Sequence, residues 1–252
     1  MNSNKKLPVI NTDIILHILS EQQDVFFVEI GSNDGKVNDP LYPYISNFGW
    51  RGILVEPQKD LFENQLSQNY QHFPGVHLLN AAIGTENSSE NLYKFSFTEA
   101  RWATGLASLK KENLEKLIAS GFIDRKAREE QILLPEDKSQ WITSENVKTM
   151  TFDQLIKDYA VEKVDAIMID TEGYDFEILK CINFNNLVPP KVIIYEHEHL
   201  IAEDYSESIK MLENLNYRVY REKRNTIAIH QTFKIPTLRF LNARIRAFLN
   251  KL

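Results

Sequence analysis

The chain has 252 residues, of which 43% are hydrophobic, 25% charged and 11% aromatic, and its formal net charge is −6. This composition is that of a globular protein with one sizeable core, and the acidic balance argues against a nucleic-acid binder. The single cysteine, Cys181, excludes an intramolecular disulfide and a multi-thiolate zinc site, so a reduced cytoplasm is the expected compartment.

Short apolar runs rich in β-branched residues alternate with helical patterns along most of the chain. The runs predict buried parallel strands at 25–30, 52–55, 76–83, 164–169 and 192–195. Helical patterns fall at 11–22, 39–48, 58–69, 151–160, 173–182 and 203–215. The runs 217–220 and 226–230 flank a polar stretch and predict an antiparallel hairpin. The chain is therefore predicted to be an α/β protein, with a seven-stranded, mostly parallel, doubly wound sheet that has helices on both faces and ends in this hairpin.

The spacing between the strands predicted at 76–83 and 164–169 is far longer than a parallel crossover needs. We therefore predict an inserted segment at about 86–148, between the third and fourth strands. Long segments of this kind often form lids or substrate-binding elements, and an extension of the sheet edge is the alternative.

The last 22 residues differ in charge from the rest of the chain. Residues 231–252 carry +5 and residues 1–230 carry −11. Apolar residues recur in this tail at helical spacing, with the basic residues off the stripe. We therefore divide the chain into a domain at 1–230 and a basic amphipathic helix at 231–252. Residues 236–252 of this helix are expected to contact their own domain, a second copy of the chain or a membrane surface.

The first predicted strand leads into a glycine-rich turn, Glu29-Ile-Gly31-Ser-Asn-Asp34-Gly35. A strand, a glycine-rich turn and a helix in this order are typical of a nucleotide-binding unit. The two glycines stand where backbone approaches a ligand. Glu56 closes the second strand 25 residues after Gly31, where an acidic side chain can accept both ribose hydroxyls.

The charge of this turn indicates which nucleotide it binds. Glu29 and Asp34 would repel the phosphates of NAD or ATP, which are normally held by bare backbone amides. S-adenosylmethionine has a ribose and an adenine but no phosphate, and it carries an ammonium and a sulfonium, so it suits an acidic turn. A nicotinamide oxidoreductase of the same fold is one alternative, and a helix-capping role for Asp34 is another.

Four motifs in chain order resemble those of class I S-adenosylmethionine-dependent methyltransferases, and their spacing resembles the FkbM-type family. They are Val28-Glu-Ile-Gly-Ser-Asn-Asp-Gly35, Gly52-Ile-Leu-Val-Glu-Pro57, Asn80-Ala-Ala-Ile-Gly84 and Met168-Ile-Asp-Thr-Glu-Gly173. The resemblance runs from about Val25 to Ile229 and includes Thr151-Phe-Asp153. It implies a Rossmann-like class I methyltransferase fold and O-methylation of a hydroxyl on a sugar or a secondary metabolite.

The resemblance also implies a cofactor site. Its residues would surround the methionine end (Glu29, Gly31, Ser32, Asn33, Asp34, Gly35), the ribose (Glu56, Pro57), the adenine (Asn80, Ala81) and the transferable methyl group (Asp170).

Polar side chains follow the fourth and fifth predicted strands, and ligands of open α/β sheets bind beyond these strand ends. Methyl transfer requires that the protein align the acceptor hydroxyl and take up its proton. His197 is the first choice for the base, because an unperturbed imidazole titrates near neutrality. Asp170 and Glu172 are predicted to orient the acceptor or the base, although Asp170 could instead cap the next helix. Glu196 is predicted to contact the acceptor.

The run Glu196-His-Glu-His199 also raises the question of a metal ion. In an extended segment the two histidines would share one face and the two glutamates the other, so these four side chains could not readily ligate one ion. No metal site is therefore predicted.

Within the inserted segment, Arg101, Trp102 and Ser108 are candidate acceptor contacts, and an Arg with a Trp would suit a sugar or an anionic acceptor. The alternative to an enzyme is a cofactor-binding or degenerate domain that acts as an interaction module, with the basic tail docking it to a partner or a membrane.

Overall fold

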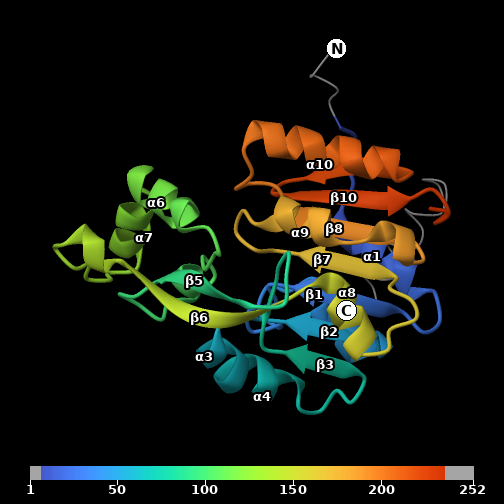
Figure 1. The fold of residues 1–252 in the computed structure, drawn as a ribbon, viewed down its shortest axis with the longest axis horizontal. Helices are drawn as coiled ribbons and strands as arrows, with labels where there is room; N and C mark the ends of the chain where they lie inside the picture. Colours follow the sequence, from blue (N-terminus) through green and yellow to red (C-terminus); the bar gives the residue numbers. More distant parts are fainter. Residues whose placement is uncertain (1–6, 236–252) are drawn as a thin grey trace.

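The computed structural model describes residues 7–235, and its main sheet has seven strands in the order β3–β2–β1–β7–β8–β10–β9 (Figure 1). The strands are β1 (Phe26–Ile30), β2 (Arg51–Val55), β3 (Val76–Leu79), β7 (Ala166–Ile169), β8 (Val192–Glu196), β9 (Tyr217–Glu222) and β10 (Asn225–His230). The first five are parallel, and β10 pairs antiparallel with both β8 and β9. The predicted α/β fold is confirmed, including the antiparallel hairpin at the C-terminal edge of the sheet.

Helices cover both faces of this sheet because its strands are apolar on both sides. Along β1, Phe27 faces the core formed with α1 (Thr12–Ser20) and α2 (Tyr42–Phe48). Val28 and Ile30 face the opposite core. That core includes side chains from α8 (Phe152–Asp158), α9 (Asp175–Cys181) and α10 (Ala202–Asn214).

Two predicted elements are divided in the structure. The helix expected at 58–69 consists of α3 (Lys59–Leu61), a π-helical turn at Phe62–Leu66 and α4 (Ser67–Tyr70). The strand expected at 76–83 ends at Leu79, and β4 (Ala82–Ile83) joins a different sheet. The Asn80 side chain donates hydrogen bonds to the carbonyls of Glu56 and Pro57, and this holds the chain where it leaves the main sheet.

The segment predicted as an insertion forms a small subdomain with its own core. Its strands β5 (Ser89–Phe95) and β6 (Ile142–Met150) form a second sheet in the order β4–β6–β5. Its helices are α5 (Arg101–Thr104), α6 (Lys111–Ala119) and α7 (Phe122–Glu129). Figure 1 shows this green subdomain beyond the edge of the main sheet at which the parallel strands end.

The predicted C-terminal helix at 236–252 lies outside the described residues, and residues 231–235 form a turn and an irregular segment after β10. Among residues 7–235, no helix combines the length and the apolarity that crossing a bilayer requires.

Candidate active site

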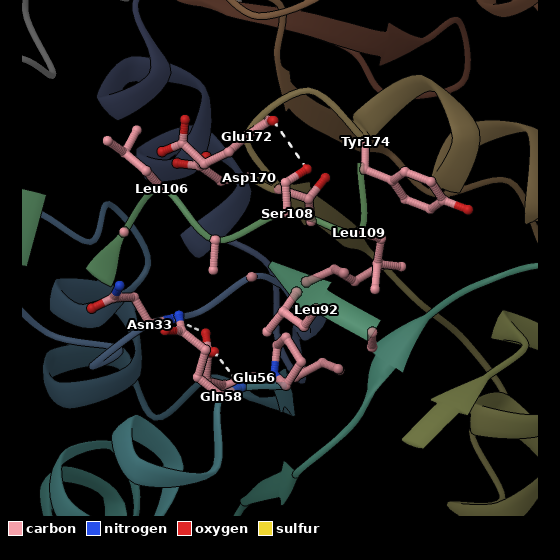
Figure 2. A pocket seen from close by; sticks show the side chains of 18 of the residues that line it. Asn33, Glu56, Gln58, Leu92, Leu106, Ser108, Leu109, Asp170, Glu172 and Tyr174 are labelled. Carbon is pink, nitrogen blue, oxygen red and sulfur yellow. Dashed lines mark hydrogen bonds between the residues drawn. The ribbon is translucent and has the colours of Figure 1, made fainter. Parts of the chain in front are cut away.

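A cavity of about 600 Å³ lies between the carboxyl ends of β1, β2 and β7 and the inserted subdomain (Figure 2). Figure 2 shows Glu56 with Asn33 and Gln58 on one side of the cavity and Asp170 with Glu172 on the other. The lining residues that the sequence singled out are Gly31, Asn33, Glu56, Pro57, Ala81, Arg101, Trp102, Ser108, Asp170 and Glu172. The volume of this cavity is typical of a site that binds a small molecule.

The glycine-rich turn begins where β1 ends. The amides of Gly31 and Ser32 both donate to the Val55 carbonyl, at 2.9 and 3.1 Å, which ties the turn to the end of β2. Gly31 has φ +84°, and a Cβ built there would lie 1.8 Å from the Asp170 carbonyl oxygen. A Cβ at Gly35 would lie 2.5 Å from the Tyr70 ring. The close backbone approach at both glycines is thus to the protein itself, although Gly31 also lines the cavity.

Glu56 is held rigidly at the end of β2. Its side chain is 3% exposed, and its two carboxylate oxygens accept hydrogen bonds from the amides of Asn33 and Gln58, each at 2.8 Å. A carboxylate has about four acceptor positions, so two remain for a ligand in the cavity. Burial raises the pKa of Glu56 to about 7, even though these two amides favour the ionised form.

Of the two residues predicted to lie beside the adenine, one lines the cavity and the other does not. Ala81 is fully buried and lines the cavity. Asn80 instead holds the backbone of Glu56 and Pro57, as described above, and does not line the cavity.

The two carboxylates of the turn lie behind the cavity wall. Asp34 accepts hydrogen bonds from the amides of Lys36 and Val37, both at 2.9 Å, so it closes the turn without capping a helix. Glu29 is 5% exposed, and its Oε2 has no hydrogen-bond partner among the described residues. Burial, followed by the nearby Asp39 and Asp170, raises the pKa of Glu29 well above its usual range.

Four carboxylates gather where β7 and β8 end: Asp170, Glu172, Asp175 and Glu196. Burial raises the pKa of Asp175 to about 8 and that of Glu196 to about 9, with Asp170 adding to both shifts. Burial, followed by the charge of Glu172, also raises the pKa of Asp170. However, the Asp170 side chain is exposed to the open volume of the cavity, so solvent there moderates its shift.

His197, the base expected from the sequence, does not reach the cavity. Its ring stacks on Tyr205 of α10 with the centroids 4.6 Å apart, and its Nδ1 lies 2.9 Å from the Thr226 hydroxyl. Burial lowers the pKa of His197 to about 4. The physical reason is strand parity: His197 follows Tyr195, whose hydroxyl lies 2.7 Å from the Ser208 hydroxyl of α10, so both side chains point toward that helix.

The inserted subdomain reaches the cavity through the three predicted acceptor contacts. Arg101 donates to the Asn33 side chain at 2.7 Å and to the Val37 carbonyl, so it joins α5 to the glycine-rich turn. The Trp102 indole donates to Glu130 at 3.0 Å, and the Ser108 hydroxyl donates to the Glu172 carbonyl at 3.4 Å.

Other lining residues carry no sequence signal of their own. They include Gln58, Phe122, Lys126, Tyr174 and Arg224. Gln58 donates to the Thr104 carbonyl at 2.9 Å, which is a second connection between β2 and the inserted subdomain. Arg224 lies in the β9–β10 turn, which the sequence marks only as polar, and only the fold brings that turn to the ends of the parallel strands.

This arrangement suits a particular kind of ligand. Glu56 offers hydrogen-bond acceptors to neighbouring hydroxyls, and the acidic wall opposite favours positive charge over phosphate. A positively charged nucleoside without a phosphate group therefore fits the cavity.

Among solved structures, similar folds occur in several methyltransferases. A methyltransferase FkbM from Methylobacillus flagellatus KT is 13% identical, with a TM-score of 0.48 over 88% of this chain and 48% of that chain. A precorrin-6y C5,15-methyltransferase from Geobacter metallireducens GS-15 is 12% identical, with a TM-score of 0.43 over 92% and 94%. A Geobacter sulfurreducens methyltransferase in complex with S-adenosyl-L-homocysteine is 10% identical, with a TM-score of 0.37 over 86% and 68%.

The chain spans about half the length of the M. flagellatus protein, and none of the curated proteins matches it. The sequence itself, however, matches the Methyltransferase FkbM domain over residues 29–221, which is most of the chain. The chain therefore belongs to the FkbM-type family of class I S-adenosylmethionine-dependent methyltransferases.

Proposed function

We propose that this protein is an O-methyltransferase that methylates a hydroxyl group of a small molecule, such as a sugar or a secondary metabolite. The observation that carries the proposal is the cavity itself, in which Glu56 faces the carboxylates of Asp170 and Glu172 beneath the inserted subdomain. This combination offers both a site for a nucleoside and carboxylates that can accept the proton of an acceptor hydroxyl.

The cofactor would lie along the glycine-rich turn. Glu56 has two acceptor positions left for the ribose hydroxyls, Ala81 and Pro57 border the adenine side, and Gly31 and Asn33 border the methionine side. When bound, S-adenosylmethionine supplies an electrophilic methyl group on a positively charged sulfur.

The chain's own residues would orient the acceptor and take up its proton. Asp170 opens directly into the cavity, and its raised pKa matches a carboxylate that accepts a proton near neutral pH. We assign the proton-accepting role to a carboxylate oxygen of Asp170 and an orienting role to Glu172. Leu92, Leu106 and Leu109 line the same cavity and exclude water from the reacting atoms.

Acceptor selection would fall to the inserted subdomain. Trp102 and Phe122 offer aromatic surfaces to a sugar, and Arg101 and Lys126 offer positive charge to an acidic substituent. Glu196, expected from the sequence to contact the acceptor, does not line the cavity. A cytoplasmic location and docking through residues 236–252 stay predictions from the sequence.

A binding measurement tests the cofactor assignment. We expect a hundredfold excess of S-adenosylhomocysteine over its dissociation constant to stabilise the protein by about 2.7 kcal/mol, while NAD at the same concentration leaves the unfolding midpoint unchanged. Transfer of a radiolabelled methyl group from S-adenosylmethionine to a panel of sugars and phenols then tests the reaction. If neither S-adenosylhomocysteine nor NAD shifts the midpoint, the interaction-module alternative is favoured.

The affinity for S-adenosylhomocysteine should depend on pH through Glu56. The folded, ligand-free protein keeps a proton on this group up to a pH of about 7. The unfolded chain releases the same proton near pH 4.5, so the stability that Glu56 contributes is lost as the pH rises through 7. Because ribose hydroxyls donate to the ionised carboxylate, the affinity should rise by up to about tenfold per pH unit below pH 7 and then level off. Calorimetric titrations between pH 5.5 and 8.5 measure this, and the rise should be shallower in Glu56→Gln.

A further inference from the structure

Three potential metal ligands meet at the carboxyl ends of β7 and β8. Glu172 follows β7, Glu196 is the last residue of β8, and His199 lies in the turn after it. The His199 Nε2 lies 3.0 Å from the Glu172 Oε2 and 3.8 Å from the Glu196 Oε2. One ligand atom from each residue lies within 4.8 Å of the other two.

All three of these ligand atoms are buried and have no hydrogen-bond partner among the described residues. The Glu196 side chain is 6% exposed, and its Oε2, which faces His199, has no hydrogen-bond partner among the described residues. Its other oxygen lies 3.3 Å from Arg224. A buried carboxylate oxygen that is left unpaired costs free energy. A cation between Glu196 and Glu172 would remove this cost.

The local backbone holds the three groups together. Glu172 and Gly173 have φ values of +51° and +93°, which turn the chain back toward β8. The Glu172 carbonyl accepts a hydrogen bond from the side-chain Nδ2 of Asn113 at 3.0 Å, so α6 of the inserted subdomain fixes this turn. Residues 197–200 also turn, with the Leu200 amide donating to the His197 carbonyl at 3.2 Å.

That second turn explains why the sequence predicts no metal site. An extended segment would separate Glu196 from His199 by strand parity, but the turn brings His199 back beside Glu196. The remaining ligand, Glu172, comes from a different strand, and no spacing in the sequence connects it with the other two.

We propose that Glu172, Glu196 and His199 bind a divalent transition-metal cation, with Mn²⁺ as the best fit. Two carboxylate oxygens and one imidazole nitrogen suit a cation that accepts both oxygen and nitrogen ligands, whereas Mg²⁺ prefers oxygen alone. The carboxylates balance the charge of the ion. Glu172 lines the cavity, so the open coordination positions of the ion would face the acceptor.

The consequence for catalysis rests on the proposed function, while the binding itself does not. An ion at this place would coordinate the acceptor hydroxyl and lower its pKa, so that Asp170 removes the proton more readily. Positioning of a hydroxyl beside the methyl donor would follow from the same coordination.

Titration of the full-length protein with Mn²⁺, followed by the loss of the free-ion electron paramagnetic resonance signal, tests the proposal. We expect one bound ion per chain. Loss of an outer-shell partner weakens metal sites by about 10–100-fold. Replacing a direct ligand, as in Glu172→Gln or His199→Ala, should weaken Mn²⁺ binding by at least that much. Matched controls at exposed positions, Glu203→Gln and His72→Ala, should leave it unchanged.

Absence of Mn²⁺ binding by the wild-type protein, or unchanged binding in both site variants, would overturn the proposal. Competition titrations, in which Zn²⁺ or Mg²⁺ displaces bound Mn²⁺, test the choice of ion. Tighter binding of Mg²⁺ than of Mn²⁺ would contradict that choice. Circular dichroism confirms that each variant is folded. If Glu172→Gln does not fold, Glu196→Gln is used in its place, and His199→Gln is used if His199→Ala does not fold. Binding of S-adenosylhomocysteine is measured in parallel. If it persists without Mn²⁺ binding, the metal site alone is wrong, and if both fail, the proposed function fails too.

Discussion

Glu56→Ala should weaken S-adenosylhomocysteine binding by at least about 100-fold. A hydrogen bond to a charged group contributes about 1.5–3 kcal/mol, and the Glu56 carboxylate has acceptor positions for two ribose hydroxyls. Loss of both contacts therefore costs about 3 kcal/mol or more, and each 1.4 kcal/mol is a factor of ten in affinity. Isothermal titration calorimetry at pH 8, where Glu56 of the wild-type protein is ionised, measures the difference.

The same substitution also removes the acceptor for two backbone amides, those of Asn33 and Gln58. Each buried amide left unpaired costs about 1–3 kcal/mol, so the variant should also be less stable. Calorimetry is therefore run well below the unfolding midpoint of the variant. Glu56→Gln, which keeps one accepting oxygen, serves as the milder variant. Glu86→Ala, at an exposed loop position, is the control and should bind like the wild type. An affinity of Glu56→Ala within threefold of the control would contradict the ribose assignment.

Gly31→Ala should lower the free energy of unfolding by about 2–5 kcal/mol. A non-glycine residue in the left-handed region costs about 1–2 kcal/mol, and forcing an extra atom into a packed site costs about 1–3 kcal/mol. Both penalties apply, since φ is +84° and the new Cβ would meet the Asp170 carbonyl oxygen at 1.8 Å. Proteins have only about 5–15 kcal/mol of total stability, so the loss is a large share of it. Urea unfolding followed by circular dichroism measures it.

Gly49→Ala is the matched control for this experiment. Gly49 has φ +65° and ends α2, but a Cβ built there has no atom within 4 Å. It should therefore show the backbone penalty alone, about 1–2 kcal/mol. If Gly31→Ala costs no more than Gly49→Ala, the contact between the turn and the end of β7 is not what requires a glycine at this position.

The sequence predicts most of the scaffold correctly because the signals are local. Buried parallel strands are short apolar runs, and the residues that follow them, such as Glu56 and Asp170, fall at the carboxyl edge of the sheet wherever the strands pair. The departures arise where a side chain redirects the backbone. Asn80 ends the third strand early by holding the carbonyls of Glu56 and Pro57, and this capacity is invisible in the apolar pattern of residues 76–83.

Within the site, the sequence identifies the right edge of the sheet but not the direction of each side chain. Glu29 lies one residue before the end of β1, yet it points behind the turn rather than into the cavity. His197 likewise points toward α10, since strand parity places it with Tyr195. Both directions depend on where each strand ends, and the boundary of a strand is the feature that a sequence pattern determines least well.

By itself, the sequence determined the doubly wound sheet with its hairpin, the acidic glycine-rich turn followed by Glu56, and membership of the methyltransferase family, because apolar period and motif spacing are properties of neighbouring residues. Only the tertiary structure decided which distant groups meet. It brought the inserted subdomain over the strand ends through Arg101 and Gln58, and it joined Glu172 to Glu196 and His199. These contacts depend on turns and strand parity in three dimensions, which the spacing of residues along the chain does not encode.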